Sequence, residues 1–353
     1  MNKLYHSFSD LIDFKSPWNI LAKKAGNPLL TYEWFYAAAQ AFHDDDKLYI
    51  FFIFSSGKPV AIAPLYQKKI SGKYGRLSII GDNDLAEPTS LIYKDNESLK
   101  ELIQFIKSKN IACLFNRIPS NIRDDLEVSS KFDYSHFINS NGSQFLDNVG
   151  DFSIFESSLS SKRKSDLRRA YKKLNSYDSH FFRIFKPTFK EINETLKIAF
   201  NVENAGWKGQ NNSSITNNRK IENFITRLFE SNSDNVSTIG LLYVNDKVIS
   251  CNLALNFEHK LWFIKIGYLE EYKKCSPGIL LTHEMIRYCG NNNIKSLEFL
   301  GSSEKWINLW RPNERNYMTF LYYPVSYSGL IAFKNDFLYM TKRKISRILT
   351  KKG

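Results

Sequence analysis

The most informative part of this sequence is the stretch Gly267-Tyr-Leu-Glu-Glu-Tyr-Lys-Lys-Cys-Ser-Pro-Gly-Ile-Leu-Leu281. The apolar run at 260–266 predicts a strand that leads into it, and the apolar spacing after the Ser-Pro-Gly turn predicts a helix. Such a loop places backbone N–H groups and a helix N-terminus beside two lysines, which suits an anion such as a pyrophosphate. A turn that binds nothing is the alternative. The residues of this predicted anion loop are Lys273, Lys274, Cys275, Ser276, Pro277 and Gly278.

Several other kinds of site are not indicated. The anion loop lacks the glycine spacing of a Walker A loop or a dinucleotide-binding turn. The six histidines and four cysteines show no metal-ligand spacing, so we expect no metal and read the cysteines as reduced thiols. The chain begins without an apolar signal segment, and its longest apolar run, 48–54, is far shorter than the ~20 residues of a bilayer span. We therefore expect a cytoplasmic protein.

The net charge of +13 is concentrated in two segments. Residues 162–173 contain seven basic residues and one acidic residue, and residues 334–353 contain the same numbers. Each segment therefore has a net charge of +6, and the two together supply 12 of the 13 charges. The rest of the chain is close to neutral, so a uniformly basic nucleic-acid-binding surface is not indicated.

An approximate internal repeat organises the chain. Residues 51–66 and 239–255 each predict a β-hairpin around a short polar turn. Downstream of each hairpin, a predicted helix ends at a polar turn and a strand begins, with Asn110 and Asn293 at corresponding positions. Two similar α/β domains packed together explain this pattern, and two generic units that look alike by chance are the alternative.

The predicted fold class is α/β (α+β), with 43% hydrophobic residues available for its core. The polar junction near residue 150 divides the chain into a first domain, 1–150, and a second, 151–330. Residues 157–174 predict a helix with one basic face. Residues 331–353 predict a basic amphipathic helix, for which we weigh docking on an anionic membrane surface against packing on the second domain.

Several short motifs resemble the GNAT superfamily of acyltransferases. They include Tyr268, Tyr272, the Ser276–Gly278 turn, Glu298-Phe-Leu-Gly301, Glu304 and Trp310, with Glu203-Asn-Ala-Gly-Trp-Lys-Gly209 upstream and 27–34 and 60–65 near the start. The closest branch looks like the CelD-like family of cell-envelope polysaccharide synthesis, which is related to the Fem aminoacyltransferases. The resemblance implies two tandem GNAT-like domains, with the donor site in the second.

The resemblance also implies how an acyl-CoA donor, such as acetyl-CoA, binds. The pyrophosphate occupies the anion loop, and the pantetheine arm lies along the open edge of the strand 261–268 as an added strand does. Deprotonation of the acceptor amine requires a general base, for which Glu203 is the first candidate and Glu298 the second. A solvated carboxylate at a helix end is the alternative for Glu203, and a surface-facing position is the alternative for Glu298. Tyr268 or Tyr272 is the candidate that protonates the leaving thiolate, with packing as the alternative.

Five residues are candidates for binding the acceptor. Trp207 suits stacking on a sugar ring or filling the core, Lys208 suits an acidic group, and Glu304 matches a family glutamate. Trp310 follows Trp306 by four residues, a spacing that places both on one helical face, as a core seam or as a binding wall. A lysine common in the family is replaced by Ile307, so its role does not transfer. In the first domain, Asp84 belongs to an acidic loop, 81–88, at the position that corresponds to the anion loop. Its carboxylates repel a pyrophosphate and attract a cationic amine, and a solvated loop is the alternative.

Together these patterns predict an acyl-CoA-dependent N-acyltransferase that acts on an amino sugar or amine in cell-envelope polysaccharide synthesis. That acceptor class rests on the resemblance alone. One alternative is a Fem-like transferase that uses aminoacyl-tRNA, with the tRNA drawn to the basic helix. Another is a degenerate GNAT-like module that docks on a membrane or an assembly complex without catalysis.

Overall fold

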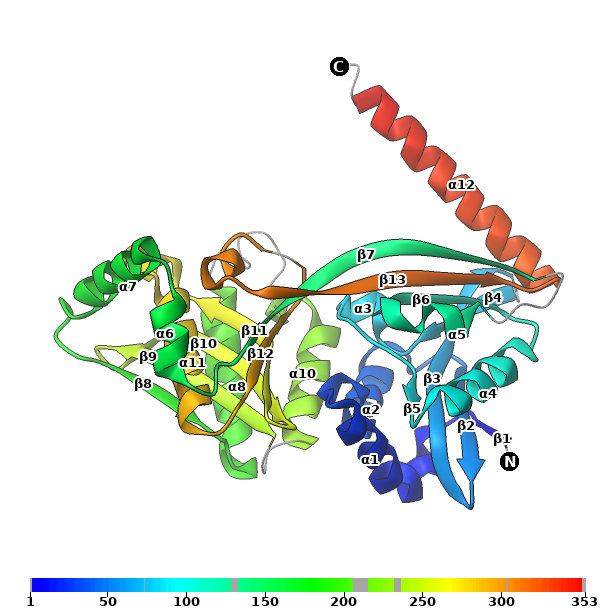
Figure 1. Ribbon diagram of the computed structural model, residues 1–353, viewed down its shortest axis with the longest axis horizontal. Coiled ribbons are helices and arrows are strands. Elements are labelled where there is room, and N and C mark those ends of the chain that lie inside the picture. Colours follow the sequence, from blue (N-terminus) through cyan, green and yellow to red (C-terminus); the bar gives the residue numbers. More distant parts are fainter. Residues whose placement is uncertain are drawn as a thin grey trace.

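A computed structural model describes residues 2–72, 74–127, 133–205, 215–231, 236–302 and 304–350 (Figure 1). In these residues, thirteen strands form one continuous mixed sheet, in the order β1-β2-β3-β4-β6-β13-β7-β12-β11-β10-β9-β8, with β5 paired to β3. The strands are β1 (Asn2–Tyr5), β2 (Leu48–Ser55), β3 (Lys58–Ser71), β4 (Tyr74–Ile79), β5 (Ile92–Tyr93), β6 (Ala112–Pro119), β7 (Tyr134–Asp147), β8 (His180–Phe185), β9 (Ser237–Val244), β10 (Lys247–Phe257), β11 (Lys260–Tyr268), β12 (Ser296–Leu300) and β13 (Asn313–Tyr323). The predicted α/β class is confirmed.

Helices cover the sheet. The α-helices are α1 (Lys15–Ala25), α2 (Tyr32–Phe42), α3 (Asp82–Leu85), α4 (Asn96–Lys107), α5 (Arg123–Leu126), α6 (Phe152–Ser158), α7 (Ser161–Leu174), α8 (Phe189–Asn204), α10 (Arg219–Ser231), α11 (Pro277–Asn291) and α12 (Tyr327–Thr350). The 3-10 turns are η1 (Phe8–Phe14), η2 (Pro28–Leu30), η3 (Ser120–Ile122), η4 (Ile215–Asn217), η5 (Glu270–Cys275) and η6 (Ile307–Trp310). No helix in the described ranges is both long and apolar enough to cross a membrane.

Both predicted hairpins are present, and their turns explain the register. Strands β2 and β3 pair antiparallel across Ser56 and Gly57, and β9 and β10 pair across Asn245 and Asp246. All four turn residues have positive φ angles, between 45° and 77°. Two such residues in succession form a type I′ turn, whose twist matches that of the flanking strands.

The internal repeat is also visible in the structure. In each half a strand is followed, after shorter intervening elements, by a helix and then by a strand parallel to the first: β4, α4 and β6 in one half, and β11, α11 and β12 in the other. Asn110 and Asn293 precede the parallel strands and have φ angles of 52° and 54°. Asparagine tolerates this left-handed conformation better than most residues, which accounts for its recurrence at both positions.

The last strand of each half crosses to the other half. Strand β7 pairs with β12 of the second half, β13 pairs with β6 of the first half, and β7 and β13 pair with each other. Figure 1 shows these two long strands running side by side between the halves. The sheet is therefore continuous across the two predicted domains. The division of the chain at residue 150 stays a prediction.

A second contact between the halves is aromatic. The ring of Trp34 on α2 lies edge-on to that of Phe224 on α10, with 5.0 Å between ring centroids. Phe42 of α2 lies 5.9 Å from the same ring. Both partners of the closer pair are almost fully buried, so this contact forms a dry seam below the exchanged strands.

Helices α8 and α11 cover opposite faces of the second half of the sheet. A Cβ added to Gly267 of β11 would meet Glu203 of α8, whereas one added to Gly240 of β9 would meet Met285 of α11. Gly240 lies opposite Asn252, which lies opposite Ile266, so Gly267 and Gly240 face opposite ways. Glu203 lies at the end of α8, and the anion loop lies at the start of α11.

Candidate active site

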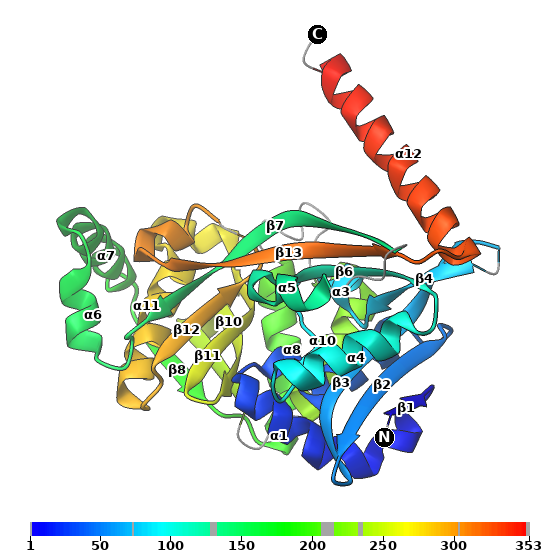
Figure 2. The same ribbon diagram turned by 45° about the vertical axis from the view of Figure 1, so that its right-hand side comes forward.

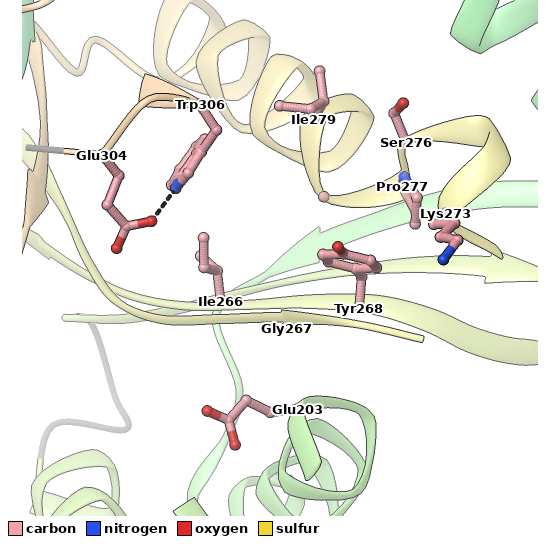
Figure 3. Close-up of a pocket in the computed structure, with 11 residues that line it drawn as sticks. Glu203, Ile266, Gly267, Tyr268, Lys273, Ser276, Pro277, Ile279, Glu304 and Trp306 are labelled. Carbon is pink, nitrogen blue, oxygen red and sulfur yellow. Dashed lines mark hydrogen bonds between the residues drawn. The ribbon is translucent and has the colours of Figure 1, made fainter. Parts of the chain in front are cut away.

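A gap opens in the sheet between β11 and β12. The two strands pair only at residues 260–262 of β11, and beyond Trp262 they diverge. A pocket of about 440 Å³ lies at this gap (Figure 3). It is lined by Glu203, Ile266, Gly267, Tyr268, Lys273, Ser276, Pro277, Gly278, Ile279, Glu304 and Trp306. The pocket thus collects predicted residues from three separate parts of the sequence.

The anion loop forms the entrance to α11. Its first part is the 3-10 turn η5, and Ser276 then takes a left-handed conformation, φ 53°, immediately before the helix begins. The Ser276 carbonyl accepts hydrogen bonds from the N–H groups of Ile279 and Leu280, at 3.0 and 3.1 Å. Pro277 has no N–H group, so the N–H of Gly278 is the first that the helix directs outward. An anion there would also meet the positive end of the helix dipole.

Four of the six predicted residues of the anion loop line the pocket, and two do not. Lys273 lines it, is 65% exposed at its side chain and forms an ion pair of 3.2 Å with Glu270. Lys274 is absent from the lining. Cys275 is buried, and its Sγ–H donates to the Tyr272 carbonyl. Burial raises the pKa of the Cys275 thiol, which disfavours the thiolate that a nucleophile needs.

Glu203 reaches the pocket from below β11. It lies at the end of α8, is 3% exposed, and its Oε2 accepts a hydrogen bond of 2.9 Å from the N–H of Ile215. Figure 3 shows it across β11 from Tyr268 and the start of α11. A Cβ on Gly267 would lie 2.7 Å from the Glu203 Cα, so only glycine allows this close approach.

Tyr268 ends β11 and lines the pocket beside Gly278. Burial, and to a smaller extent the negative charge of Glu270, raises the pKa of Tyr268, so its hydroxyl stays protonated at neutral pH. The ring of Tyr272 packs instead against Tyr177, 5.7 Å away, and does not line the pocket. Of the two tyrosines, only Tyr268 is positioned to give a proton to a group bound here.

Glu304 and Trp306 form the wall of the pocket opposite β11 (Figure 3). The indole Nε1–H of Trp306 donates to Glu304 Oε2 at 2.6 Å, which fixes both side chains. Trp306 was not among the predicted site residues. Its position two residues after the candidate Glu304 could have indicated it. The four-residue spacing to Trp310 suggested instead that the two tryptophans share a helical face.

That expectation about a shared helical face is wrong. Residues 307–310 form only the 3-10 turn η6, and Trp310 points into the core, where it is 2% exposed. Its ring stacks with that of His283 at 6.1 Å and lies under the guanidinium of Arg163 at 4.3 Å. The structure therefore does not bring Trp310 to the pocket, and the buried Ile307 follows the same turn into the core.

Glu298 is also away from the pocket. Strand β12 lies inside the sheet between β11 and β7, and all five of its residues are buried. Glu298 is 1% exposed there, and its two oxygens accept hydrogen bonds from Arg315 at 2.6 and 3.2 Å. The surface-facing alternative for this residue is therefore wrong. The structure shows a buried ion pair, without contact to the other candidates.

The corresponding gap in the first half is filled by its own chain. Asp82 accepts a hydrogen bond of 3.2 Å from the N–H of Asn116 on β6, and the N–H of Thr89 donates to the Arg117 carbonyl at 3.2 Å. Asp84 lies in the same loop, 3.5 Å from the His43 ring, and does not line the pocket. Burial raises the pKa of Asp82 to about 8, so it is mostly neutral at pH 7. The contacts of the chain's own loop, more than the charge of its carboxylates, distinguish this gap from the one between β11 and β12.

The remaining two predicted residues, Trp207 and Lys208, lie outside the described residues. Among the residues that the structure does describe, no cluster of three histidine, cysteine or acidic side chains could hold a metal ion. The site as described thus consists of a strand edge, a helix N-terminus, two carboxylates, one tyrosine and one tryptophan.

Comparisons with known proteins agree with this geometry. Residues 161–307 match the family model described as the acetyltransferase (GNAT) domain. The structure of FemX is similar, with a TM-score of 0.61 and 11% identity, over 96% of this chain and 99% of that one. A protein of unknown function from Bacteroides thetaiotaomicron gives 0.58 and 12% identity, over 91% and 99%.

A third similar structure is the C-terminal domain of a putative lysylphosphatidylglycerol synthetase from Agrobacterium fabrum, with a TM-score of 0.55 and 10% identity, over 88% and 91%. No curated protein matches the chain. At such low identities these likenesses show the fold alone, and they do not single out the CelD-like branch. The family match covers residues 161–307 and, like the fold, agrees with the resemblance to the GNAT superfamily: this segment is similar to a GNAT acetyltransferase domain.

Proposed function

We propose that the chain transfers an acyl group from an acyl-CoA, such as acetyl-CoA, to the amine of an amino sugar or a similar acceptor in cell-envelope polysaccharide synthesis. The single observation that carries the proposal is the pocket at the gap between β11 and β12. One open strand edge and one helix N-terminus meet there with Glu203, Tyr268 and Glu304. An acyl-CoA fits these elements, with its pyrophosphate at the helix N-terminus and its pantetheine arm along the strand edge.

Each element has a distinct task. The N–H of Gly278 and the start of α11 bind the pyrophosphate, with Lys273 nearby as a counter-charge. The edge of β11 beyond Trp262 hydrogen-bonds the pantetheine arm as a neighbouring strand would. This arrangement carries the arm from the pyrophosphate back along β11, past Tyr268, and directs the thioester towards Glu203.

The reaction then needs two proton transfers. The amine nitrogen attacks the thioester carbonyl, a C–N bond forms and the C–S bond breaks. Glu203 takes the proton that the amine loses, directly or through water, and the Tyr268 hydroxyl gives its proton to the departing sulfur. The Tyr268 hydroxyl is protonated at neutral pH, so its proton is available when the thiolate develops.

The wall formed by Glu304 and Trp306 supports an amine as the acceptor. A carboxylate and an aromatic ring both attract a cationic amine before it is deprotonated. The hydrogen bond between the two side chains holds them in place for that contact. The sugar character of the acceptor rests on the family resemblance.

A second candidate donor is an aminoacyl-tRNA. The observation that favours it is the basic helix α7, which lies beside the anion loop. The positive charge of Lys173 on α7 acts on Cys275, and Tyr177, just after the helix, contacts Tyr272. A nucleic acid held on α7 would bring its acylated end near the pocket, and its affinity would fall steeply with salt.

Ligand-dependent thermal stability separates these proposals from a module without catalysis. The purified chain is heated with acetyl-CoA, and separately with charged tRNA, since a ligand of the native state raises the melting temperature. Stabilisation by acetyl-CoA and release of free thiol with a panel of nucleotide amino sugars would support the main proposal. Stabilisation by charged tRNA alone would favour the second donor. If neither ligand raises the melting temperature, the result would favour the GNAT-like docking module without catalysis.

Titration calorimetry tests the location of the donor. We expect one molecule of CoA per chain, because the gap of the first half is filled by its own loop. Gly278→Asp should abolish the binding, and Asp84→Asn should leave it unchanged. Two equivalent sites per chain would contradict the assignment of the donor to the second half.

A further inference from the structure

Helix α12 projects from the body of the molecule. Figures 1 and 2 show it leaving the end of β13 and extending away from the sheet. Its root is fastened to the first half by polar contacts. Asp336 forms a bidentate ion pair with Arg76 of β4, at 2.8 and 2.9 Å, and the Ser328 hydroxyl donates to the Gly75 carbonyl at 2.8 Å. The root is therefore rigidly oriented, and the rest of the helix is presented to the surroundings.

A group of exposed apolar side chains marks this root. Tyr327 is 74% exposed, Leu330 66% and Phe337 59%, at the spacing of one helical face, and Phe333 is 47% exposed. Tyr134 of β7 joins them, because its ring lies 6.1 Å from that of Phe333, which stacks at 6.4 Å on Phe337. We name these five residues the apolar patch. A contiguous apolar patch of this kind usually marks an interaction surface.

The sequence from residue 334 onwards is strongly basic. Residues 334–353 contain seven lysines and arginines and a single acidic residue, Asp336. That one carboxylate is already paired with Arg76, so it does not offset the others. The β3–β4 hairpin adds the exposed Lys68 and Lys69, next to Ile70, which packs in a small cluster with Ala332 of α12. Aromatic rings and cations therefore occur together.

We propose that the apolar patch and the basic residues of α12 dock the protein on an anionic lipid surface. A nucleic acid would use the cations but not the exposed aliphatic and aromatic residues, and an apolar protein groove would not use the cations. A bilayer surface uses both, because rings insert at the headgroup level while lysines and arginines attract anionic lipids. The docking does not depend on the proposed acyl transfer.

Vesicle co-sedimentation of the full chain tests the proposal. Mixed phosphatidylcholine and phosphatidylglycerol vesicles should bind the protein, and pure phosphatidylcholine vesicles should bind it much more weakly. Raising the salt from about 0.1 M to about 1 M, which shortens the Debye length from ~10 to ~3 Å, should release most of it. Equal binding to both kinds of vesicle, or no binding to either, would overturn the proposal.

Variants separate the two contributions. Lys342→Gln with Arg343→Gln and Lys344→Gln should weaken binding by about 100-fold, at about fivefold for each basic residue. The matched control, Lys186→Gln with Lys190→Gln and Lys197→Gln, removes the same charge from exposed positions in the second half and should bind as the wild type does. Equal loss in both triple variants would show an effect of net charge alone, against the proposal.

The apolar patch is tested by Phe337→Ser. Because burial of one phenylalanine is lost, vesicle binding should weaken by about tenfold or more, with the melting temperature unchanged. Light scattering distinguishes a second occupant, another copy of this chain. If the wild type is a dimer that Phe337→Ser converts to a monomer, and neither binds vesicles, the patch is a dimer interface and the proposal fails.

Discussion

The carboxylate of Glu87, in the first half, accepts a hydrogen bond of 2.8 Å from the backbone N–H of Gly301, in the second half. The guanidinium of Arg117, also in the first half, donates to the Gly301 carbonyl at 2.5 Å. Gly301 has a φ of 56° and turns the chain from β12 towards Glu304 and Trp306. The first half thus holds the turn that precedes the acceptor wall of the pocket, although none of its own residues lines the pocket.

Glu87→Ala should therefore impair use of the acceptor more than binding of the donor. We expect kcat/KM for the acceptor to fall by about tenfold or more, because a small displacement of the wall misplaces the amine. The Kd of CoA should stay within about twofold, and Glu87→Gln, which keeps an oxygen acceptor for Gly301, should recover most of the activity. Steady-state kinetics and calorimetry measure both quantities. Identical losses in the two variants would argue against this positioning role.

Gly278→Asp should block the donor without unfolding the protein. A Cβ at this position meets only the Tyr268 ring, at 3.4 Å, so the side chain has room. The added carboxylate repels the pyrophosphate, and we expect the Kd of CoA to rise by about 100-fold or more. Gly278→Ala adds the Cβ without the charge and is the matched control, with a much smaller change. Calorimetry on both variants decides, and tight binding by Gly278→Asp would remove the anion loop from the site.

The two candidate bases should respond differently to the same substitution. Glu203→Gln keeps the shape and one oxygen for the Ile215 N–H, and we expect kcat to fall by about 10²-fold with the melting temperature almost unchanged. Glu298→Gln weakens the buried pair with Arg315, and we expect a loss of stability of up to about 3 kcal/mol, since Arg315 is 38% exposed. Urea unfolding and pH–rate profiles separate the effects. An unaltered profile in Glu203→Gln would exclude it as the base.

Gly267→Ala tests the close approach of α8 to β11. The new methyl group would lie 2.7 Å from the Glu203 Cα and 2.8 Å from its Cβ, so helix and strand must separate. We expect a loss of stability of about 1–3 kcal/mol and a fall in kcat as Glu203 moves. The control is Gly150→Ala, whose methyl group approaches no atom closer than 3.4 Å. Equal melting temperatures for the two variants would contradict the proposed crowding.

Asp82 should make stability depend on pH. Its folded pKa, about 8, exceeds the ordinary value of 3.8, so the folded state holds a proton that the unfolded state releases above about pH 4. This contribution to stability is present at lower pH and is lost as pH rises from about 4 to about 8. Asp82→Asn should therefore gain stability over the wild type from pH 5 to pH 8, measured by urea unfolding. A difference between Asp82→Asn and the wild type that does not change with pH would refute the effect.

Local sequence patterns were sufficient for much of the fold and for one side of the site. The hairpins and the repeat at Asn110 and Asn293 depend on residues close together in the chain, and the structure confirms them. The helix predicted over 157–174 is also present, but it begins only at Ser161, after α6 ends at Ser158. The anion loop and Tyr268 are neighbours in sequence, so their meeting at one pocket follows from a strand that leads into a helix. Glu203 was identified through the family motif, because no local pattern connects it to β11.

Relationships between distant strands were beyond the reach of such patterns. The burial of Glu298 depends on β7 lying beside β12, and the sequence of β12 does not indicate that neighbour. The contact of Glu87 with Gly301 joins residues 214 positions apart. Trp310 and Trp306 separate because a single 3-10 turn, and not a longer helix, follows β12. In each case the long-range arrangement overrides the local expectation.

The exchange of β7 and β13 makes the folding of each half depend on the other. If the first half unfolds, β13 loses its hydrogen-bonded partner β6. Strand β12 also loses its partner β7, so one edge of β12 is left unpaired. The second half is therefore not expected to keep its pocket when the first half is unfolded, even though every residue that lines the pocket lies in the second half. The two halves are therefore expected to melt in a single cooperative transition, so that damage far from the site removes activity in an all-or-none manner.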